Sequence, residues 1–207
     1  MKKYHKYVFN IEERKFIGKF EEMYKNESIE VYDSWHQEDS RKLERNIDFA
    51  ILQNYNFNFI VDIGCGKGAI THRLKKSNNR VMGIDISETA LNIAKERYPD
   101  IEFFYHNIND VAEFDRHLSD IKLKIDLVYC SEILSYIENW EELLKIISFH
   151  TDYLLISLFI PDNPIGFVKN DNELISEYKK YYQIIEWVSL HESLFTIIFC
   201  RSKKCDI

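Results

Sequence analysis

The chain has no hydrophobic run long enough to cross a bilayer. The longest apolar stretch, Tyr153-Leu-Leu-Ile-Ser-Leu-Phe-Ile160, has eight residues, whereas a membrane-spanning helix needs about 20. The first residues, Met1-Lys-Lys-Tyr-His-Lys6, lead into a charged stretch without the apolar core of a secretory signal. We therefore expect a cytoplasmic protein that does not interact with membranes.

Cysteine, proline and glycine are scarce, with 4, 3 and 6 residues among 207. The cysteines form no Cys-x-x-Cys pair, so we expect reduced thiols and neither a disulfide framework nor a metal site. No repeat, low-complexity tract or Pro/Gly-rich linker interrupts the chain. This length is most simply one domain, residues 1–207, with a sizeable core.

Positively charged residues are also few: the chain has 27 Lys and Arg against 34 Asp and Glu, which gives a net charge of −7. A nucleic-acid partner normally requires a basic surface. The Asp/Asn-Pro-Pro-aromatic motif of many base-amino methylating enzymes is also missing, since Asn163-Pro164 lacks the second proline. We therefore expect a small-molecule partner and no nucleic acid.

Three of the few glycines are concentrated in one loop, Gly64-Cys-Gly-Lys-Gly68, between the apolar run Phe59–Ile63 and a helical pattern. Without a Cβ, such a loop turns sharply and lets a ligand lie directly against the backbone, which predicts a nucleoside cofactor. Together with Ala69, the first two glycines also satisfy the Gly-x-Gly-x-x-Gly/Ala pattern of dinucleotide sites. The glycines alone therefore leave NAD open.

Asp62, just before this loop, distinguishes between the two cofactors. A pyrophosphate would bind backbone N–H groups at the start of the following helix, and a neighbouring carboxylate would repel it. S-adenosylmethionine has no phosphate and carries an ammonium and a sulfonium, which a carboxylate attracts. The charge favours S-adenosylmethionine, with S-adenosylhomocysteine as the product.

Three further segments follow at regular intervals. Arg80–Asp85 is predicted to be a second strand, whose final carboxylate lies about 20 residues beyond the first glycine, where ribose recognition needs an acceptor. Residues Ile101–Asp110 predict a third strand with its exit loop, and Ile125–Tyr136 predict a fourth strand that passes into a loop. Strands that alternate with helical segments indicate a parallel sheet covered by helices.

In order and spacing, residues 58–140 resemble the class I S-adenosylmethionine-dependent methyltransferase family. The resemblance implies that the loop from Asp62 to Gly68 wraps the methionine part, that Asp85 takes the ribose hydroxyls, and that a residue after the third strand holds the adenine amino group. That residue is usually acidic in the family; here it is Asn107, whose carbonyl oxygen can accept the same bond. The implied cofactor-binding set is Asp62, Gly64, Cys65, Gly66, Gly68, Asp85, Ile86, Asn107, Ile108 and the backbone carbonyl of Cys130.

Each feature also has a purely structural interpretation. The glycine turn can be a plain connection, Asp85 and Ser87 can cap a helix, and Asn107 can shape a turn. Four loops with suitable chemistry in the expected order favour a cofactor site over these separate explanations.

The last third of the chain is predicted to contain a buried fifth strand at residues 153–160 and a terminal hairpin of residues 183–190 and 194–201. The hairpin is similar to the antiparallel end of the methyltransferase sheet, whereas a dehydrogenase would continue with parallel units and a second domain. The predicted fold is α/β and Rossmann-like, with a seven-stranded, mostly parallel sheet, an antiparallel C-terminal hairpin strand and helices on both faces.

Two amphipathic patterns precede the glycine loop. Phe16, Phe20, Met23 and Tyr24 predict a helix over residues 11–25, and a second pattern predicts one over residues 40–54. The apolar positions of the second pattern are Leu43, Ile47, Ala50 and Ile51. We expect residues 1–55 to form a helical lid over an α/β core of residues 56–207.

The acceptor side is expected near the ends of the first and fourth strands. Because the sulfonium is a strong electrophile, the protein mainly aligns a nucleophile; a hydroxyl also needs a base or a low pKa. Glu132 is the predicted catalytic carboxylate, although it could merely solvate the next helix, and His36 is a second candidate base. Tyr32 and Trp35 are predicted to stack on the acceptor, and Arg45 to hold an anionic group, although it also fits an exposed helix face.

The segments Phe20–Asn26 and Ser131–Tyr136, with Tyr32 and Trp35, are also similar to the nodulation-factor N-methyltransferase subgroup. This similarity implies an amino-sugar or sugar-nucleotide acceptor, methylated on nitrogen or oxygen. Two alternatives of other kinds stay open: a NAD-binding oxidoreductase and a non-catalytic partner that binds S-adenosylmethionine. The sequence is compatible with a monomer or a homodimer.

Overall fold

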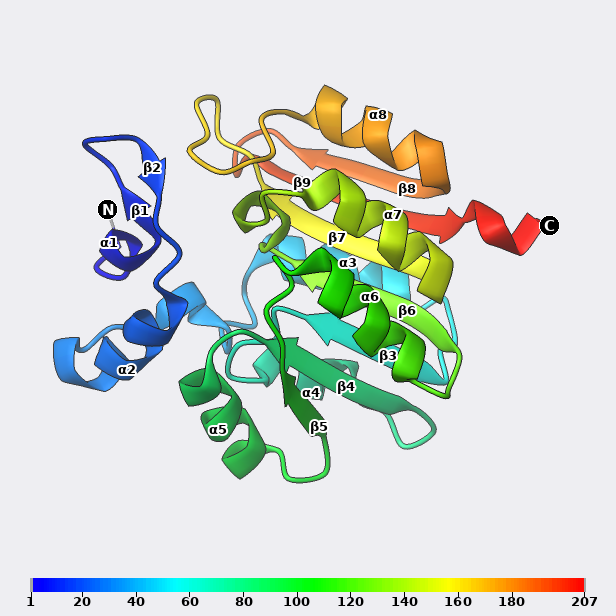
Figure 1. Cartoon of the computed structure of the whole chain (residues 1–207), viewed down its shortest axis with the longest axis horizontal. Coiled ribbons are helices and arrows are strands. Elements are labelled where there is room, and N and C mark those ends of the chain that lie inside the picture. Colours follow the sequence, from blue (N-terminus) through cyan, green and yellow to red (C-terminus); the bar gives the residue numbers. More distant parts are fainter. Residues whose placement is uncertain (1, 207) are drawn as a thin grey trace.

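A seven-stranded sheet forms the centre of the computed structural model, which describes residues 2–206 and the side chains of residues 2–204 (Figure 1). The strand order is β5-β4-β3-β6-β7-β9-β8. All neighbouring strands are parallel except at β9, which is antiparallel to both β7 and β8. The predicted fold class is confirmed. The strands are β3 (Phe59–Ile63), β4 (Arg80–Asp85), β5 (Glu102–Tyr105), β6 (Ile125–Ser131), β7 (Thr151–Phe159), β8 (Tyr182–Leu190) and β9 (Phe195–Ser202).

Helices cover both faces of this sheet, so the central strands read as continuous apolar runs. All five residues of β3 are buried. One face packs against α6 (Val111–Asp120), α7 (Trp140–His150) and α8 (Asp171–Tyr181). The other packs against α3 (Leu43–Leu52), α4 (Ala69–Leu74) and α5 (Glu88–Arg97). Figure 1 shows α6 and α7 in front of the sheet and α3 and α4 behind it.

Three helices of the core, α5, α6 and α8, start where a side chain accepts from a backbone N–H of the first turn. The hydroxyl of Ser87 accepts from the N–H of Ala90 at 3.1 Å, as predicted for the helix after β4. Asp110 and Asn170 cap α6 and α8 in the same way. These caps fix the point at which the chain leaves the sheet edge, and so the positions of the loops above it.

The N-terminal segment differs from the prediction. A helix over residues 11–25 is wrong for residues 11–19, because α1 (His5–Val8) leads into a hairpin of β1 (Phe9–Asn10) and β2 (Lys15–Phe16). The helix α2 begins only at Phe20 and ends at Glu30. The rings of Phe16 and Phe20 both pack against the ring of Tyr136, with centroid–centroid distances of 5.6 and 5.4 Å. The two residues have helical spacing in the sequence, but they lie in different elements, β2 and α2, and share a contact with Tyr136.

The helix at residues 40–54 is confirmed as α3, but its predicted apolar face is wrong at Leu43 and Ala50, which are exposed, whereas Ile51 packs against the core. Leu43 is 57% exposed. The buried face instead carries three charged residues with Leu52: Glu44, Arg45 and Asp48. These charges are buried because polar groups of the sheet edge and the lid meet them, as described below.

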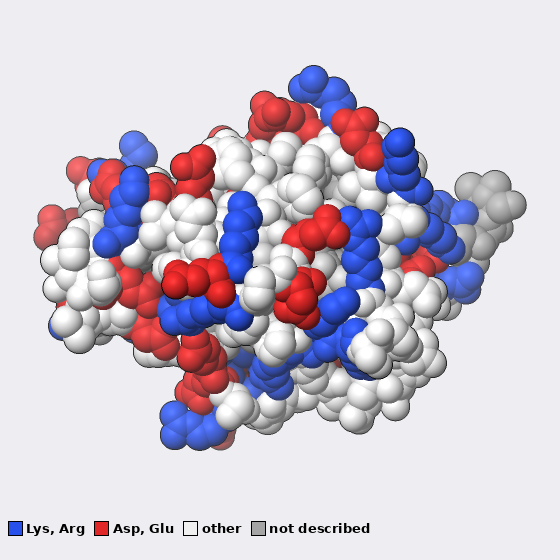
Figure 2. All heavy atoms as spheres, turned by 90° about the horizontal axis from the view of Figure 1, so that it is seen from below, with Lys and Arg blue, Asp and Glu red and all other residues white. Residues whose placement is uncertain are grey.

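We use the name lid for the elements before α3, residues 2–42 (Figure 1, left). The division into a lid of residues 1–55 and a core of residues 56–207 stays a prediction. On the face seen in Figure 2, both signs of charge are interspersed over the lid and the core. Within residues 2–206, none of the helices is long and apolar enough to span a membrane.

Candidate cofactor and acceptor site

The loops after β3, β4, β5 and β6 surround a cavity at the carboxyl ends of these strands, under the lid. Its empty volume, open solvent included, is about 910 Å³. Six predicted cofactor residues line it: Asp62, Gly64, Cys65, Asp85, Ile86 and Ile108. Three predicted acceptor-side residues also line it: Trp35, Arg45 and Glu132.

The glycine loop requires its glycines. Gly64, Gly66 and Gly68 have φ angles of 76°, 53° and 80°, in the left-handed region that disfavours residues with a Cβ. A Cβ on Gly64 would lie 2.2 Å from Cγ2 of Ile133, and one on Gly66 would lie 2.0 Å from Nε2 of Gln37. The loop is therefore packed tightly between the segment after β6 and the lid. Gly66 and Gly68 shape this turn without lining the cavity.

Asp85 ends β4 with both carboxylate oxygens already oriented. Oδ2 accepts from the N–H of Gly66 at 2.8 Å, and Oδ1 accepts from the N–H of Ser87 at 2.9 Å. Burial raises the pKa of the Asp85 carboxyl, and these backbone donors partly offset the effect. Each carboxylate oxygen has a second lone pair, so capping the next helix leaves Asp85 able to accept from a ribose diol as well.

Asp62 is buried at the end of β3, where Oδ2 accepts from the hydroxyl of Thr71 at 2.6 Å. Burial raises the pKa of Asp62 to about 7, and the Thr71 hydroxyl only partly offsets this. A desolvated carboxyl of this kind ionises readily only when a cation arrives beside it. The position therefore suits a ligand with an ammonium group.

The loop after β5 places a different residue beside the cavity from the one predicted. Asn107 is exposed, and its side-chain oxygen accepts from the N–H of Asn109 at 3.2 Å in a local turn. His106, Ile108 and Asn109 line the cavity instead. His106 is 7% exposed, and burial lowers the pKa of its imidazole. Its Nε2 has no hydrogen-bond partner among the described residues.

Glu132, the first residue after β6, projects from a strained backbone position with φ of 60°. Its N–H donates to the carbonyl of Ser157 at 2.7 Å, which fixes the turn. Its Oε1 lies 3.7 Å from Nζ of Lys42 and 3.8 Å from Nη2 of Arg45. The predicted catalytic carboxylate is thus inside the cavity, with two cations beside it.

Arg45 is buried rather than on an exposed helix face. Its Nη1 donates to the carbonyl of His36 at 2.5 Å and its Nη2 to that of Trp35 at 2.9 Å. Trp35 lines the cavity, as predicted, and its ring lies 5.8 Å from that of Tyr136. Together with Phe20 these rings form the aromatic wall of the cavity.

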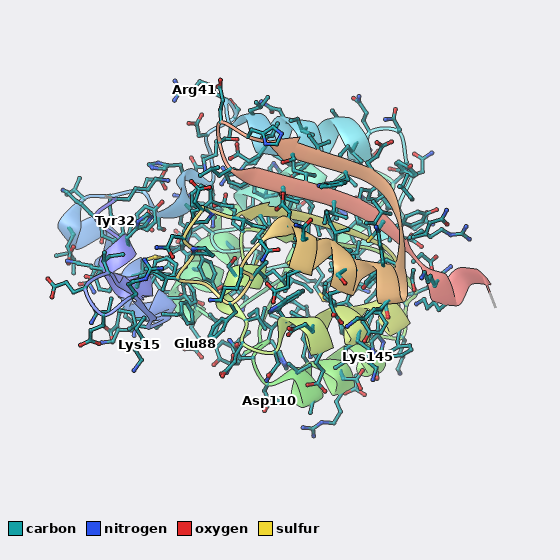
Figure 3. All side chains as sticks on the ribbon, turned by 90° about the horizontal axis from the view of Figure 1, so that it is seen from above. Lys15, Tyr32, Arg41, Glu88, Asp110 and Lys145 are labelled. Carbon is teal, nitrogen blue, oxygen red and sulfur yellow. The ribbon has the colours of Figure 1, made fainter. Side chains whose placement is uncertain are left out.

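The structure does not bring two other predicted side chains to the cavity. The imidazole Nδ1 of His36 lies 3.4 Å from Asp33, and the residue is absent from the cavity lining. The hydroxyl of Tyr32 donates to the backbone carbonyl of Met23 inside the lid, where Figure 3 labels it. Cys130, which was predicted to act through its backbone carbonyl, has a fully buried side chain near the end of β6, and this role stays a prediction.

Sequence reasoning missed further residues of this site besides His106 and Asn109. Gln37 and Tyr24 of the lid line the cavity; Oε1 of Gln37 accepts from the N–H of Lys67 at 2.8 Å. Tyr129 also lines the cavity, and its hydroxyl donates to Oδ2 of Asp48 at 2.7 Å. Burial raises the pKa of Asp48 to about 7. Only the spacing of Glu44, Asp48 and Leu52 could have indicated a buried polar face on α3.

Parts of the chain are similar in sequence to known methyltransferases. Residues 61–151 match the family model described as "Methyltransferase domain". A putative methyltransferase 235L of Invertebrate iridescent virus 6 is 31% identical over 117 residues, which are 51% of this chain and 39% of that protein. Nodulation protein S of Azorhizobium caulinodans is 30% identical over 84 residues, 41% and 38% of the two chains.

A ubiquinone biosynthesis O-methyltransferase of Coxiella burnetii is 27% identical over 86 residues, 42% of this chain and 36% of that protein. The matched region therefore spans less than half the length of each of these curated relatives.

Solved structures show the same fold at low sequence identity. A S-adenosylmethionine-dependent methyltransferase from Clostridium acetobutylicum superposes with a TM-score of 0.63 at 12% identity, covering 89% of this chain and 98% of that one. Magnesium protoporphyrin IX methyltransferase from Synechocystis, solved with bound S-adenosylmethionine, superposes with a TM-score of 0.58 at 18% identity. The match covers 77% of this chain and 79% of that one. These comparisons confirm the predicted resemblance to methyltransferases, and the solved structures show the shared fold.

Proposed function

We propose that this chain, which carries a methyltransferase domain of the class I fold, transfers a methyl group from S-adenosylmethionine to an amine or hydroxyl of a small acceptor. The observation that carries the proposal is the convergence of Asp62, the glycine loop and Asp85 on one cavity at the carboxyl ends of the parallel strands. Ligands of open α/β sheets bind at this edge. The family match over residues 61–151 supports the same conclusion.

The residues of the cavity fit this cofactor. Asp85 has a free lone pair on each oxygen for the ribose hydroxyls, and Ile86 and Ile108 offer apolar surface for the adenine. Asp62 provides a buried carboxyl for the ammonium, in a place where a pyrophosphate would be repelled. The cofactor itself supplies a methyl group on a positively charged sulfur, which any aligned nucleophile can attack.

The chain then has to orient the acceptor and to handle one proton. The Glu132 carboxylate is the polar group of the acceptor end that can accept a hydrogen bond from an incoming amine or hydroxyl. Lys42 and Arg45, within 4 Å of it, hold the carboxylate in place. Closure of the lid removes water from around the nucleophile, and alignment then supplies much of the rate.

Two acceptor classes suit the aromatic wall of Phe20, Trp35 and Tyr136. Such rings stack on the apolar face of a sugar, and the similarity to Nodulation protein S agrees with the carbohydrate hypothesis. The same rings stack on a planar phenol, and a relative named for ubiquinone biosynthesis makes this the second candidate. In both classes Glu132 would face the reacting nitrogen or oxygen.

Calorimetric titration with S-adenosylhomocysteine, and separately with NADH, tests the proposal. We expect saturable binding of S-adenosylhomocysteine alone, and its loss in Asp85→Ala. Asp100→Ala, an exposed change before β5, is the matched control and should bind as the unmodified chain does. Binding of NADH alone would overturn the proposal. Methyl transfer from labelled S-adenosylmethionine to panels of amino sugars and phenols then identifies the acceptor class.

A further inference from the structure

The lid is tied to the glycine loop by Lys67, the residue between Gly66 and Gly68. Its Nζ donates to Oε1 of Glu27 at 2.6 Å and to Oδ1 of Asp33 at 2.9 Å. Lys67 is only 7% exposed although it belongs to a loop; the side chain of Glu27 is also largely buried, whereas that of Asp33 is half exposed. A lysine buried to this extent requires its anionic partners.

Glu27 connects this lysine to the turn that carries Trp35. Its Oε1 accepts from the N–H of Ser34 at 3.2 Å and its Oε2 from the Ser34 hydroxyl at 2.9 Å. The next two residues, Trp35 and His36, have φ angles of 61° and 46°. Residues with a Cβ are disfavoured in this region, so the surrounding contacts must impose the turn.

Arg45 holds the same turn from the opposite side, through the carbonyls of Trp35 and His36. The turn is therefore fixed between two cations. One belongs to the loop after β3, which we assign to the cofactor, and the other to α3. Between them the indole of Trp35 lies against Tyr136 in the aromatic wall of the acceptor end.

A second set of bonds ties the lid to the element after β4. The Glu21 carboxylate accepts from the hydroxyls of Ser87 at 2.6 Å and Thr89 at 2.7 Å, at the start of α5. Burial alone would favour the neutral acid, but these bonds lower the pKa of Glu21 to about 2. The lid thus contacts the exits of β3 and β4, the strands that carry Asp62 and Asp85.

We propose that Lys67 is a positioning residue that couples the cofactor loop to the acceptor wall, by holding the Trp35 turn through Glu27 and Ser34. Movement of the glycine loop, as a cofactor enters or leaves, then moves the lid with it. The proposal rests on the proposed function, because it takes this loop as the cofactor site.

Hydrogen exchange of the ligand-free full chain tests the link directly. We expect Lys67→Met to speed exchange of the amides of residues 20–37 by about tenfold or more, since breaking a buried ion pair is strongly destabilising locally. Amides of β3 and β6 should keep their protection. Lys67→Arg, which retains the cation, should restore slow exchange in the lid.

Lys19→Met is the matched control, because Lys19 pairs with Glu22 within the lid, with both side chains about half exposed and 3.3 Å apart. It should leave exchange unchanged. Exchange in Lys67→Met no faster than in Lys19→Met would overturn the proposal. Should Lys67→Met lose core protection, Glu27→Gln tests the link from its other partner, and an unchanged lid in that variant would refute it equally.

The dissociation rate of S-adenosylhomocysteine, measured by stopped-flow displacement, separates this inference from the proposed function. We expect dissociation from Lys67→Met to be about tenfold faster than from the unmodified chain, in line with lid opening. An unmodified chain that binds no S-adenosylhomocysteine, together with a lid that opens in Lys67→Met, would refute the cofactor assignment and support the link. Normal binding with an unchanged lid would refute the link alone.

Discussion

Asp48→Asn should stabilise the protein, and increasingly so as the pH rises. Asp48 is fully buried on α3 and accepts one hydrogen bond, from the hydroxyl of Tyr129. Burial raises its pKa from 3.8 to about 7. The native state binds this proton more tightly than the unfolded state does. The contribution of Asp48 to the free energy of unfolding therefore falls as the pH rises from about 4 to about 7, and it is constant at higher pH.

The size of the effect follows from the two pKa values. The difference between the two pKa values of Asp48 corresponds to about 4 kcal/mol of unfolding free energy in full. About 2.5 kcal/mol of this is lost between pH 5 and pH 8. Asparagine keeps an oxygen for Tyr129 and does not titrate. The free energy of unfolding of Asp48→Asn relative to the unmodified chain should therefore rise by about 2.5 kcal/mol over this interval.

Urea unfolding, followed by far-UV circular dichroism at pH 5 and pH 8, measures this difference. Other titrating groups cancel, because they are common to both chains. The exposed change Asp100→Asn should give no such pH-dependent difference. If the difference between Asp48→Asn and the unmodified chain stays constant within about 0.5 kcal/mol, the raised pKa of Asp48 is refuted.

Three further outcomes are expected at the site. Glu132→Gln should bind S-adenosylhomocysteine normally and slow methyl transfer about a hundredfold; undiminished turnover would remove Glu132 from the reaction. Affinity for S-adenosylhomocysteine should fall as the pH drops through about 7, because Asp62 becomes protonated, and calorimetry of Asp62→Asn should show a flatter pH profile. Gly64→Ala should lower the free energy of unfolding by about 3 kcal/mol, since it combines an unfavourable φ with a Cβ 2.2 Å from Ile133; unchanged thermal stability would contradict the tight packing.

The parallel core was predictable because each strand and its exit loop is encoded locally. The run Phe59–Ile63, the glycines after it and Asp85 at the end of the next strand predict their own structure without knowledge of distant residues. Ser87 capping α5 is local in the same sense. Such local patterns keep their predicted structure in the folded chain. The alternation of strands and helices then restricts how the strands can be arranged in one sheet.

The lid was not predictable by the same reasoning, because its structure depends on distant partners. Phe16 and Phe20 have helical spacing, but both pack on Tyr136, more than a hundred residues away. The buried charges of α3 likewise depend on residues of the sheet edge, since Asp48 meets Tyr129 and Arg45 lies near Glu132. Periodicity alone therefore assigned the apolar face of α3 to residues that the structure exposes, such as Leu43.

Arg45 shows how such long-range contacts change a functional hypothesis. A guanidinium presents a planar fork of donors, and here two arms already serve the carbonyls of His36 and Trp35. If Arg45 mainly holds the turn, Arg45→Lys should loosen the amides of residues 33–37 in the ligand-free chain, because a point charge cannot bind two carbonyls as a fork does. If it mainly holds an anionic acceptor, that exchange should stay slow and the KM for the acceptor should rise instead. Hydrogen exchange of the ligand-free chain therefore distinguishes the two roles before the acceptor is known.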